Sequence, residues 1–190
     1  VQFDDAYITQ ADMNIAKYKF DKMLQEIVEA VKATDYRIAL SSPTNFRHSI
    51  LPSYKGNRAG LEGPIVRSPL KEWVKEEYPE CIEFDDLEGD DVLGIMMTKP
   101  LKINYGKRIC CTIDKDLKTV PGLHYNFDKP DEGVFIVTPE QAELYHLQQT
   151  ITGDTTDGYS GCPGVGEVGA LKALLEPRKV QKHLHTFSRG

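Results

Sequence analysis

The chain has 190 residues, 40% of them hydrophobic, and a formal net charge of −6. Length and apolar content predict one globular domain and exclude a disordered chain. The negative charge excludes binding of nucleic acid through an overall basic surface, although basic residues can still be grouped locally. No apolar run approaches the roughly 20 residues of a membrane span, and we expect no contact with a membrane.

Helical and strand-like patterns alternate along the chain. Helices are predicted over residues 13–31, 70–78, 89–98 and 139–151, with another starting near Glu167. Strands are predicted over residues 36–40, 81–84, 108–113, 123–126 and 134–137. This alternation indicates an α/β fold with a mostly parallel central sheet flanked by helices, in a single domain over residues 1–190.

The four cysteines, Cys81, Cys110, Cys111 and Cys162, show neither a CxxC pair nor the spacing of metal ligands. We interpret them as reduced thiols of a cytoplasmic protein, mostly in its core. A monomer is expected.

Three acidic clusters carry the candidate chemistry. They are Glu88, Asp90 and Asp91 in LEGDDVLG, Asp114 and Asp116 in TIDKDLKT, and Asp154 and Asp157 in GDTTDG. Each cluster alone has a structural explanation, because acids favour helix starts, and Asp favours turns and N-caps. The second cluster directly follows an apolar strand, where ligand sites of open α/β sheets lie.

Taken together, the seven carboxylates predict a cation site at one edge of the sheet. Their mutual repulsion has to be offset, and oxygen ligands alone favour Mg²⁺ or Mn²⁺ over zinc. Two such ions about 4 Å apart can clamp the attacking and leaving oxygens of a phosphodiester. The acids therefore suggest an enzyme that acts on a nucleic-acid backbone.

Two further segments suit that substrate. After Asp157 comes a glycine-rich run that leads into the helix near Glu167, and backbone N–H groups at a helix start can receive a phosphate. The segment SYKGNRAG, residues 53–60, offers the Tyr54 ring for base stacking, and Lys55 and Arg58 for phosphate contacts. An ordinary solvated loop is the alternative for this segment.

In order along the chain, SYKGNR, LEGDDVLG, TIDKDLKT and GDTTDGYSGCPGVGEVGALKAL resemble the motifs of the 5′-nuclease family. This family includes flap endonucleases, the 5′-nuclease domains of bacterial DNA polymerases and phage 5′–3′ exonucleases. The chain looks most similar to the short exonucleases of podophages. The resemblance implies a PIN-like 5′-nuclease core over residues 1–152, with a short arch over 53–78, and a helix–two-turn–helix motif over 153–178.

The resemblance also implies roles for individual residues. Metal ligands would be Glu88, Asp90, Asp91, Asp114, Asp116, Asp154 and Asp157, and catalytic residues would be Lys55, Arg58 and Asp116. DNA contacts would come from Tyr54, Lys55, Asn57, Arg58, Ser160, Gly161, Gly164, Val165 and Gly166. The implied cofactors are Mg²⁺ or Mn²⁺ at two positions, with K⁺ held by loop carbonyls of the helix–two-turn–helix.

The implied activity is metal-dependent hydrolysis of phosphodiesters at 5′ ends or flaps of duplex DNA, in phage DNA replication and degradation within the host cytoplasm. RNA strands in RNA/DNA hybrids are left open as substrates. The chain departs from the family in three places: it lacks the first strand with a DGD-like pattern, Ser42 stands where an Asp is usual, and it ends soon after the glycine-rich run. We therefore expect a weakened first metal position and further residues beyond both ends.

Two alternatives follow from the residues. A non-catalytic or weakly active module that binds DNA ends would explain Ser42 and the missing strand. A haloacid dehalogenase-like phosphatase would use Asp114 and Asp116 as its nucleophile motif, but such a motif normally lies on the first strand of the domain, and Thr119 is one residue too far from Asp116.

Overall fold

The structure, a computed structural model, describes residues 2–3, 6–7, 12–56, 63–99 and 106–175. Its helices are α1 (Met13–Val31), α2 (Arg47–Ile50), α3 (Arg67–Glu77), α4 (Gly89–Thr98), α5 (Pro139–Thr152) and α6 (Glu167–Leu175), with short 3-10 helices η2 (Lys115–Thr119) and η3 (Pro130–Glu132). Its strands are β1 (Gln2–Phe3), β2 (Ala6–Tyr7), β3 (Ile38–Leu40), β4 (Cys81–Glu83), β5 (Ile109–Cys111), β6 (Gly122–Tyr125) and β7 (Val134–Val137). All helices and strands expected from the sequence are present, and α2, β1, β2 and the two 3-10 helices are additional.

The α/β class is confirmed, but the expected single central sheet is divided. Among the described residues, β3 pairs in parallel with β4, while β5 pairs in parallel with β6 and β6 in antiparallel with β7. A separate antiparallel pair is formed by β1 and β2. Helix α4 contacts β3, β4 and β5 and so connects the two small sheets. The carboxyl ends of β3 and β5 contribute to one recess, which is described below.

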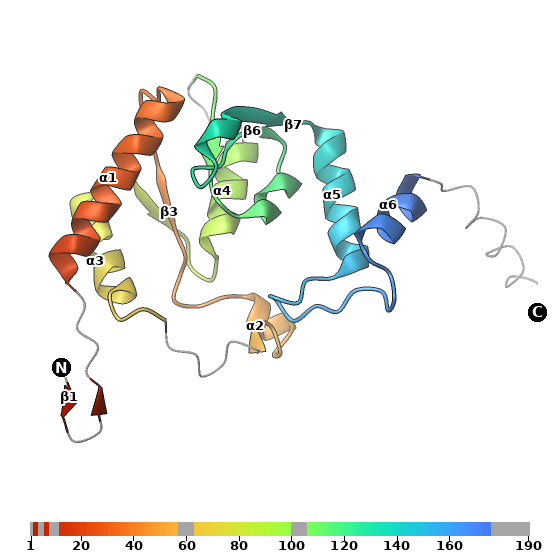
Figure 1. Cartoon of the computed structure of the whole chain (residues 1–190), viewed down its shortest axis with the longest axis horizontal. Coiled ribbons are helices and arrows are strands. Elements are labelled where there is room, and N and C mark those ends of the chain that lie inside the picture. Colours follow the sequence, from red (N-terminus) through yellow and green to blue (C-terminus); the bar gives the residue numbers. More distant parts are fainter. Residues whose placement is uncertain (1, 4–5, 8–11, 57–62, 100–105, 176–190) are drawn as a thin grey trace, which may run out of the picture.

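Helices flank this arrangement on two sides (Figure 1). Helix α1 lies along α3, where the Phe20 ring meets Trp73 and Tyr78 at centroid distances of 6.1 and 5.6 Å. Helix α5 contacts η2 and α6, on the far side of α4 from α1. None of the described helices has the length and apolar character that crossing a lipid bilayer requires.

Helix α5 starts at a capping box, in which Thr138 and Gln141 satisfy each other's backbone N–H groups. It ends at Gly153, and the loop of residues 153–166 then leads to α6 (Figure 1). No helix forms between α5 and α6, so the predicted helix–two-turn–helix is not confirmed. Instead, Asp154 and Tyr159 form a two-residue bridge through paired backbone hydrogen bonds of 2.7 and 2.8 Å.

Two glycines close this loop. A Cβ atom on Gly161 would lie 2.4 Å from the backbone nitrogen of Gly153, and one on Gly153 would lie 2.5 Å from that of Gly161. Both also have positive φ, of 60° and 80°, which disfavours other residues. The position of Asp154 and Asp157 therefore depends on close backbone approach at these glycines.

Gly161→Ala should destabilise the protein by at least about 2 kcal/mol, because the loop has to move and the new side chain sits in a left-handed conformation. Urea denaturation measures this change. Gly164→Ala is the matched control: it has a similar φ, of 75°, but open space around the Cβ position, so only the smaller conformational cost should appear. Equal losses in the two variants would contradict the close-approach explanation.

Candidate active site

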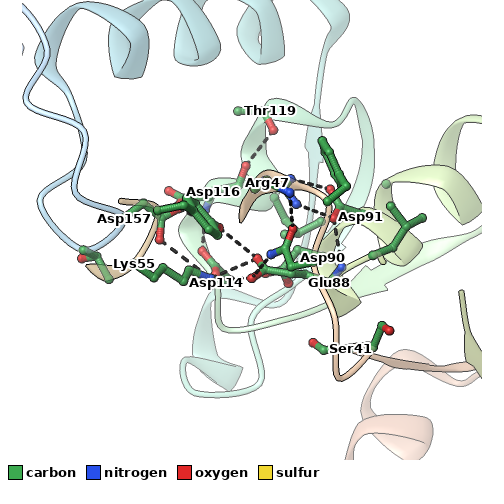
Figure 2. A pocket seen from close by; sticks show the side chains of 18 of the residues that line it. Ser41, Arg47, Lys55, Glu88, Asp90, Asp91, Asp114, Asp116, Thr119 and Asp157 are labelled. Atoms are coloured by element: carbon green, nitrogen blue, oxygen red, sulfur yellow. Dashed lines mark hydrogen bonds and ion pairs between the residues drawn. The ribbon is translucent and has the colours of Figure 1, made fainter. Parts of the chain in front are cut away.

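A recess of about 1030 Å³ lies where the ends of β3 and β5, α2, the start of α4 and the loop after α5 meet. All seven acids predicted from the sequence line it: Glu88, Asp90, Asp91, Asp114, Asp116, Asp154 and Asp157. In Figure 2 the labelled side chains from Lys55 and Asp157 across Asp114 to Arg47 and Asp91 form one continuous group. The convergence expected from the three clusters is therefore present in the structure.

The start of α4 supplies the first cluster. Glu88 and Asp91 form a capping box, and the Glu88 backbone N–H donates to Asp91 Oδ2 at 3.0 Å. Helix capping, the structural explanation weighed for this cluster, thus applies to two of its three acids. Asp90 takes no part in the cap and lies in the group shown in Figure 2.

The second cluster begins η2 after β5. Asp114 is the N-cap and accepts the Asp116 backbone N–H at 2.8 Å. Asp116 in turn accepts a hydrogen bond of 2.5 Å from the side-chain amide of Gln149 on α5. Gln149 could not be selected from the sequence, because what distinguishes it is its place on the face of α5 that contacts η2.

The third cluster lies in the loop after α5. Asp154 Oδ1 accepts the backbone N–H of Thr156 at 2.7 Å and that of Asp157 at 3.4 Å, so this acid stabilises its own turn. The carboxylate of Asp157 faces Lys55, with 3.8 Å between Nζ and Oδ1.

Lys55 connects the first and third clusters. Its Nζ lies 2.8 and 3.0 Å from the two carboxylate oxygens of Glu88, and its backbone N–H donates to the Asp157 carbonyl at 3.4 Å. Its φ of 52° is the left-handed conformation, which is uncommon for a residue other than glycine. The ammonium group therefore neutralises carboxylates from two separate segments.

The structure corrects the role expected for Tyr54. The residue is only 8% exposed, and its hydroxyl donates to Glu88 at 3.2 Å and to Asp157 at 3.4 Å. Because the ring is buried, it is not available for stacking on a base, and its hydroxyl instead holds two carboxylates. Sequence composition could not distinguish these roles, since both use an aromatic residue beside a lysine.

The remaining predicted residues divide into two groups. Asn57 and Arg58 lie outside the described residues. The predicted DNA-contacting residues of the loop do not line the acidic recess: Ser160, Gly161, Gly164, Val165 and Gly166. Of these, Ser160, Gly164 and Gly166 are exposed ahead of α6.

Sequence reasoning also missed Asn45 and Arg47, on the segment that leads into α2. The Asn45 side-chain amide donates to Glu88 Oε1 at 2.7 Å, and Arg47 makes two hydrogen bonds of 2.7 Å to Asp91. No sequence signal selects them, because their segment mixes polar and apolar residues and α2 is too short to show helical periodicity.

The carboxylates respond differently to this environment. Asp90 is exposed as a residue, but partial desolvation of its carboxyl in the recess, together with the charges of Asp114 and Glu88, raises its pKa to about 6. Burial and Asp114 also raise the pKa of Asp116, against the hydrogen bond from Gln149. Burial acts in the same direction on Glu88, but the hydrogen bond from Lys55 leaves its pKa lowered. Asp90 and Asp116 therefore have less compensating positive charge than Glu88.

The donor set fits a hard divalent cation in its chemistry, since oxygen atoms line the recess and their charges repel one another. Within the part of the chain that the structure describes, however, no three His, Cys, Asp or Glu side chains are close enough together to hold a metal ion. Lys55 and Gln149 engage carboxylates that such an ion would use. Binding would therefore require side chains to rotate toward the ion.

Ser42 lines the recess at the end of β3, as expected for the place of the missing acid. Its Oγ lies 3.2 Å from Thr44 Oγ1, and the neighbouring Ser41 Oγ accepts the Gly89 N–H at 2.9 Å. The end of β3 therefore contributes no negative charge, and Ser41 supports the start of α4.

Comparison with known proteins identifies the family of the chain. A family model described as the N-terminal resolvase-like domain of 5′–3′ exonucleases matches residues 6–141. The chain therefore belongs to the 5′–3′ exonuclease family. It is 36% identical to the exodeoxyribonuclease of Enterobacteria phage T3 over 133 residues, which cover 68% of the chain and 43% of that protein. It is 35% identical to the exonuclease of Escherichia phage T7 over 133 residues, 68% of the chain and 44% of that protein.

The chain thus spans less than half the length of these two phage relatives. Among solved structures, it is similar to the flap endonuclease of bacteriophage T5 in a complex with DNA and metal ions. The TM-score is 0.64 at 16% sequence identity, with 84% of this chain and 65% of the T5 chain covered. This similarity confirms the fold expected from the motifs.

The pKa of Asp90 predicts a pH dependence of stability. Because folding raises this pKa from 3.8 to about 6, the folded state favours the protonated carboxyl, and the metal-free protein loses stability as the pH rises between these values. Asp90→Asn should remove that loss. We expect little difference from wild type near pH 4 and a gain of about 1 kcal/mol near pH 8, since water in the recess screens part of the repulsion.

Urea denaturation in the presence of EDTA at both pH values measures this difference. An Asn variant that is less stable than wild type near pH 8 would contradict the assigned repulsion. Mg²⁺ should then stabilise the wild-type protein more than the variant.

Proposed function

We propose that this protein is a divalent-metal-dependent 5′–3′ exonuclease that hydrolyses phosphodiesters at 5′ ends or flaps of duplex DNA. The observation that carries the proposal is the recess itself, which acids from three separate segments line and in which the ammonium group of Lys55 contacts acids of two of them. A purely structural role would not require so much like charge at one place, because each carboxylate raises the cost of ionising its neighbours.

Six carboxylates would hold the metal: Glu88, Asp90, Asp114, Asp116, Asp154 and Asp157. Oxygen ligands favour Mg²⁺ or Mn²⁺. Bound ions would supply Lewis acidity toward the scissile phosphate and the water that attacks it. With Ser41 and Ser42 at the end of β3, the side of the recess formed by that strand would hold an ion more weakly than the side formed by η2 and the loop after α5.

Lys55 would serve the phosphate group. In the free protein its ammonium group is held by Glu88 and Asp157, and a bound substrate would offer it a negatively charged oxygen in their place. Arg58 would add a second cation from the same segment. Tyr54 would keep Glu88 and Asp157 in place through its hydroxyl.

The exposed backbone ahead of α6 would bind the duplex away from the recess. Gly164 and Gly166 have open space where a Cβ would lie, so a DNA backbone can approach their N–H groups closely. Carbonyl groups of this loop would supply the ligands for K⁺.

The relatives support this assignment through their names, exodeoxyribonuclease and exonuclease, and the T5 structure through the DNA and metal ions that it contains. We extend these properties to the present chain as part of the proposal, together with a monomeric state and a location in the host cytoplasm. RNA strands of hybrids are a further candidate substrate.

A second candidate function is favoured by two observations. The neutral end of β3 and the absence, among the described residues, of three acids already close enough to hold an ion would suit a module that binds DNA ends without efficient cleavage. The two functions differ in whether nucleotides are released.

A nuclease assay on a 5′-labelled duplex with Mg²⁺ or Mn²⁺ separates them. We expect wild type to release labelled nucleotides, Asp116→Ala to lose the activity, and Lys55→Ala to slow it by about 100-fold or more with little change in duplex affinity. If wild type binds the duplex but releases no more label than Asp116→Ala, the enzyme assignment fails and the binding module remains.

Gly166→Ala tests the duplex surface. Nothing lies within 4 Å of the added Cβ in the free protein, so stability should stay within about 0.5 kcal/mol of wild type. Duplex binding should weaken and lose part of its salt dependence, because the added methyl group keeps phosphates away from the loop. Fluorescence anisotropy at several salt concentrations measures both effects, and unchanged binding would contradict the proposed surface.

A further inference from the structure

The ion pair between Arg47 and Asp91 is not explained by the proposed chemistry. Arg47 uses two nitrogens to contact both oxygens of Asp91 at 2.7 Å, a bidentate geometry. The pair is partly buried, with side-chain exposures of 31% for Arg47 and 21% for Asp91. It joins the segment before Lys55 to the start of α4, across 44 residues of sequence.

Both carboxylate oxygens of Asp91 already accept hydrogen bonds, which distinguishes it from Asp90. One of its oxygens accepts from Arg47, and the other accepts from Arg47 and from the Glu88 backbone N–H of the capping box. A divalent ion on either oxygen would have to displace a guanidinium nitrogen or lie beside its positive charge. Asp90 is adjacent in sequence, but takes no part in the cap, and within the described part of the chain no Arg or Lys forms an ion pair with it.

Arg47 is itself fixed in place. Its guanidinium carbon lies 4.8 Å from the centroid of the Phe46 ring and 5.8 Å from that of Tyr54, so two aromatic rings contribute to holding it. The same segment makes three further contacts with Glu88, from the Asn45 amide, the Tyr54 hydroxyl and the Lys55 ammonium group. Arg47 is the member of this group that contacts Asp91 instead (Figure 2).

We propose that Asp91 is not a metal ligand, and that the Arg47–Asp91 pair is a positioning pair that docks the segment of residues 45–55 onto the start of α4. Through this docking, Glu88 and Lys55 meet in the correct geometry. The kinetic part of this inference rests on the proposed function, whereas the assignment of Asp91 concerns metal binding alone. It replaces the metal-ligand role that the motif resemblance implies for Asp91.

Metal titration tests the assignment directly. Calorimetric titration with Mn²⁺ should give Asp91→Asn an affinity within about threefold of wild type, while Asp90→Asn and Asp114→Asn lose at least about tenfold. Asn is isosteric with Asp, so the helix start is disturbed as little as possible. An equal loss of affinity in Asp91→Asn and Asp90→Asn would overturn the assignment.

Kinetics test the positioning role. Arg47→Met should lower kcat by about tenfold and leave KM for the duplex within about threefold, because the pair acts on the geometry of the acids and Lys55. The double variant with Asp91→Asn should be no slower than Arg47→Met alone, within about twofold, since both changes remove one interaction. A raised KM with unchanged kcat would make Arg47 a substrate contact, and multiplied losses would show independent roles. Either result would overturn the proposal.

The chain offers a matched control in Arg37 and Asp35, an exposed ion pair of 2.7 Å at the amino end of β3, away from the recess. Arg37→Met should leave kcat and Mn²⁺ affinity unchanged, and a loss in either would mean that removing any Arg ion pair has these effects, which overturns the specific role. If Arg47→Met does not fold, Arg47→Lys keeps the charge, loses the bidentate geometry and should still lower kcat. If wild type releases no nucleotides, the proposed function fails, but the Mn²⁺ titrations still decide the role of Asp91.

Discussion

Repulsion among carboxylates is the constraint around which the recess is organised. Seven acids line it, and the described structure opposes their charges with Lys55 at Glu88 and Asp157 and with Arg47 at Asp91. Among the described residues neither Asp90 nor Asp116 forms an ion pair, and the more distant charges of Lys55 and Lys115 do not prevent desolvation and neighbouring acids from raising the pKa of both. This cost at one place supports the proposal that the recess binds cations from solution.

The local structure around each acid explains how so much charge is tolerated. Glu88 and Asp91 cap α4, Asp114 caps η2, and Asp154 stabilises a turn, so four of the acids already accept backbone N–H groups. The structural explanation and the functional one are therefore compatible for these residues, because each carboxylate has more than one lone pair to offer. The divided sheet matters less than α4, which contacts both halves and carries the central cluster between them.

Local sequence patterns were enough to predict most of the helices and strands and the acids that line the recess. Periodicity identified α1, α4 and α5 to within a residue, and apolar runs located β4 to β7, because these elements depend on which residues they contain. Contacts between distant segments determine the division into two sheets and the buried position of Tyr54. They also determine the loop of residues 153–166, which forms no helix of its own ahead of α6. Arg47 and Gln149 escaped notice for the same reason: each acts on an acid at least 33 residues away.

Crystals soaked in Mn²⁺ would test the central claim most directly, because anomalous scattering locates the ion without reference to activity. We predict peaks in the recess that contact Asp90 and Asp114 or Asp116, with Lys55 displaced from Glu88. A recess that binds no Mn²⁺ while Lys55 stays on Glu88 would contradict the account, since the acids would then form a closed network of ion pairs and caps.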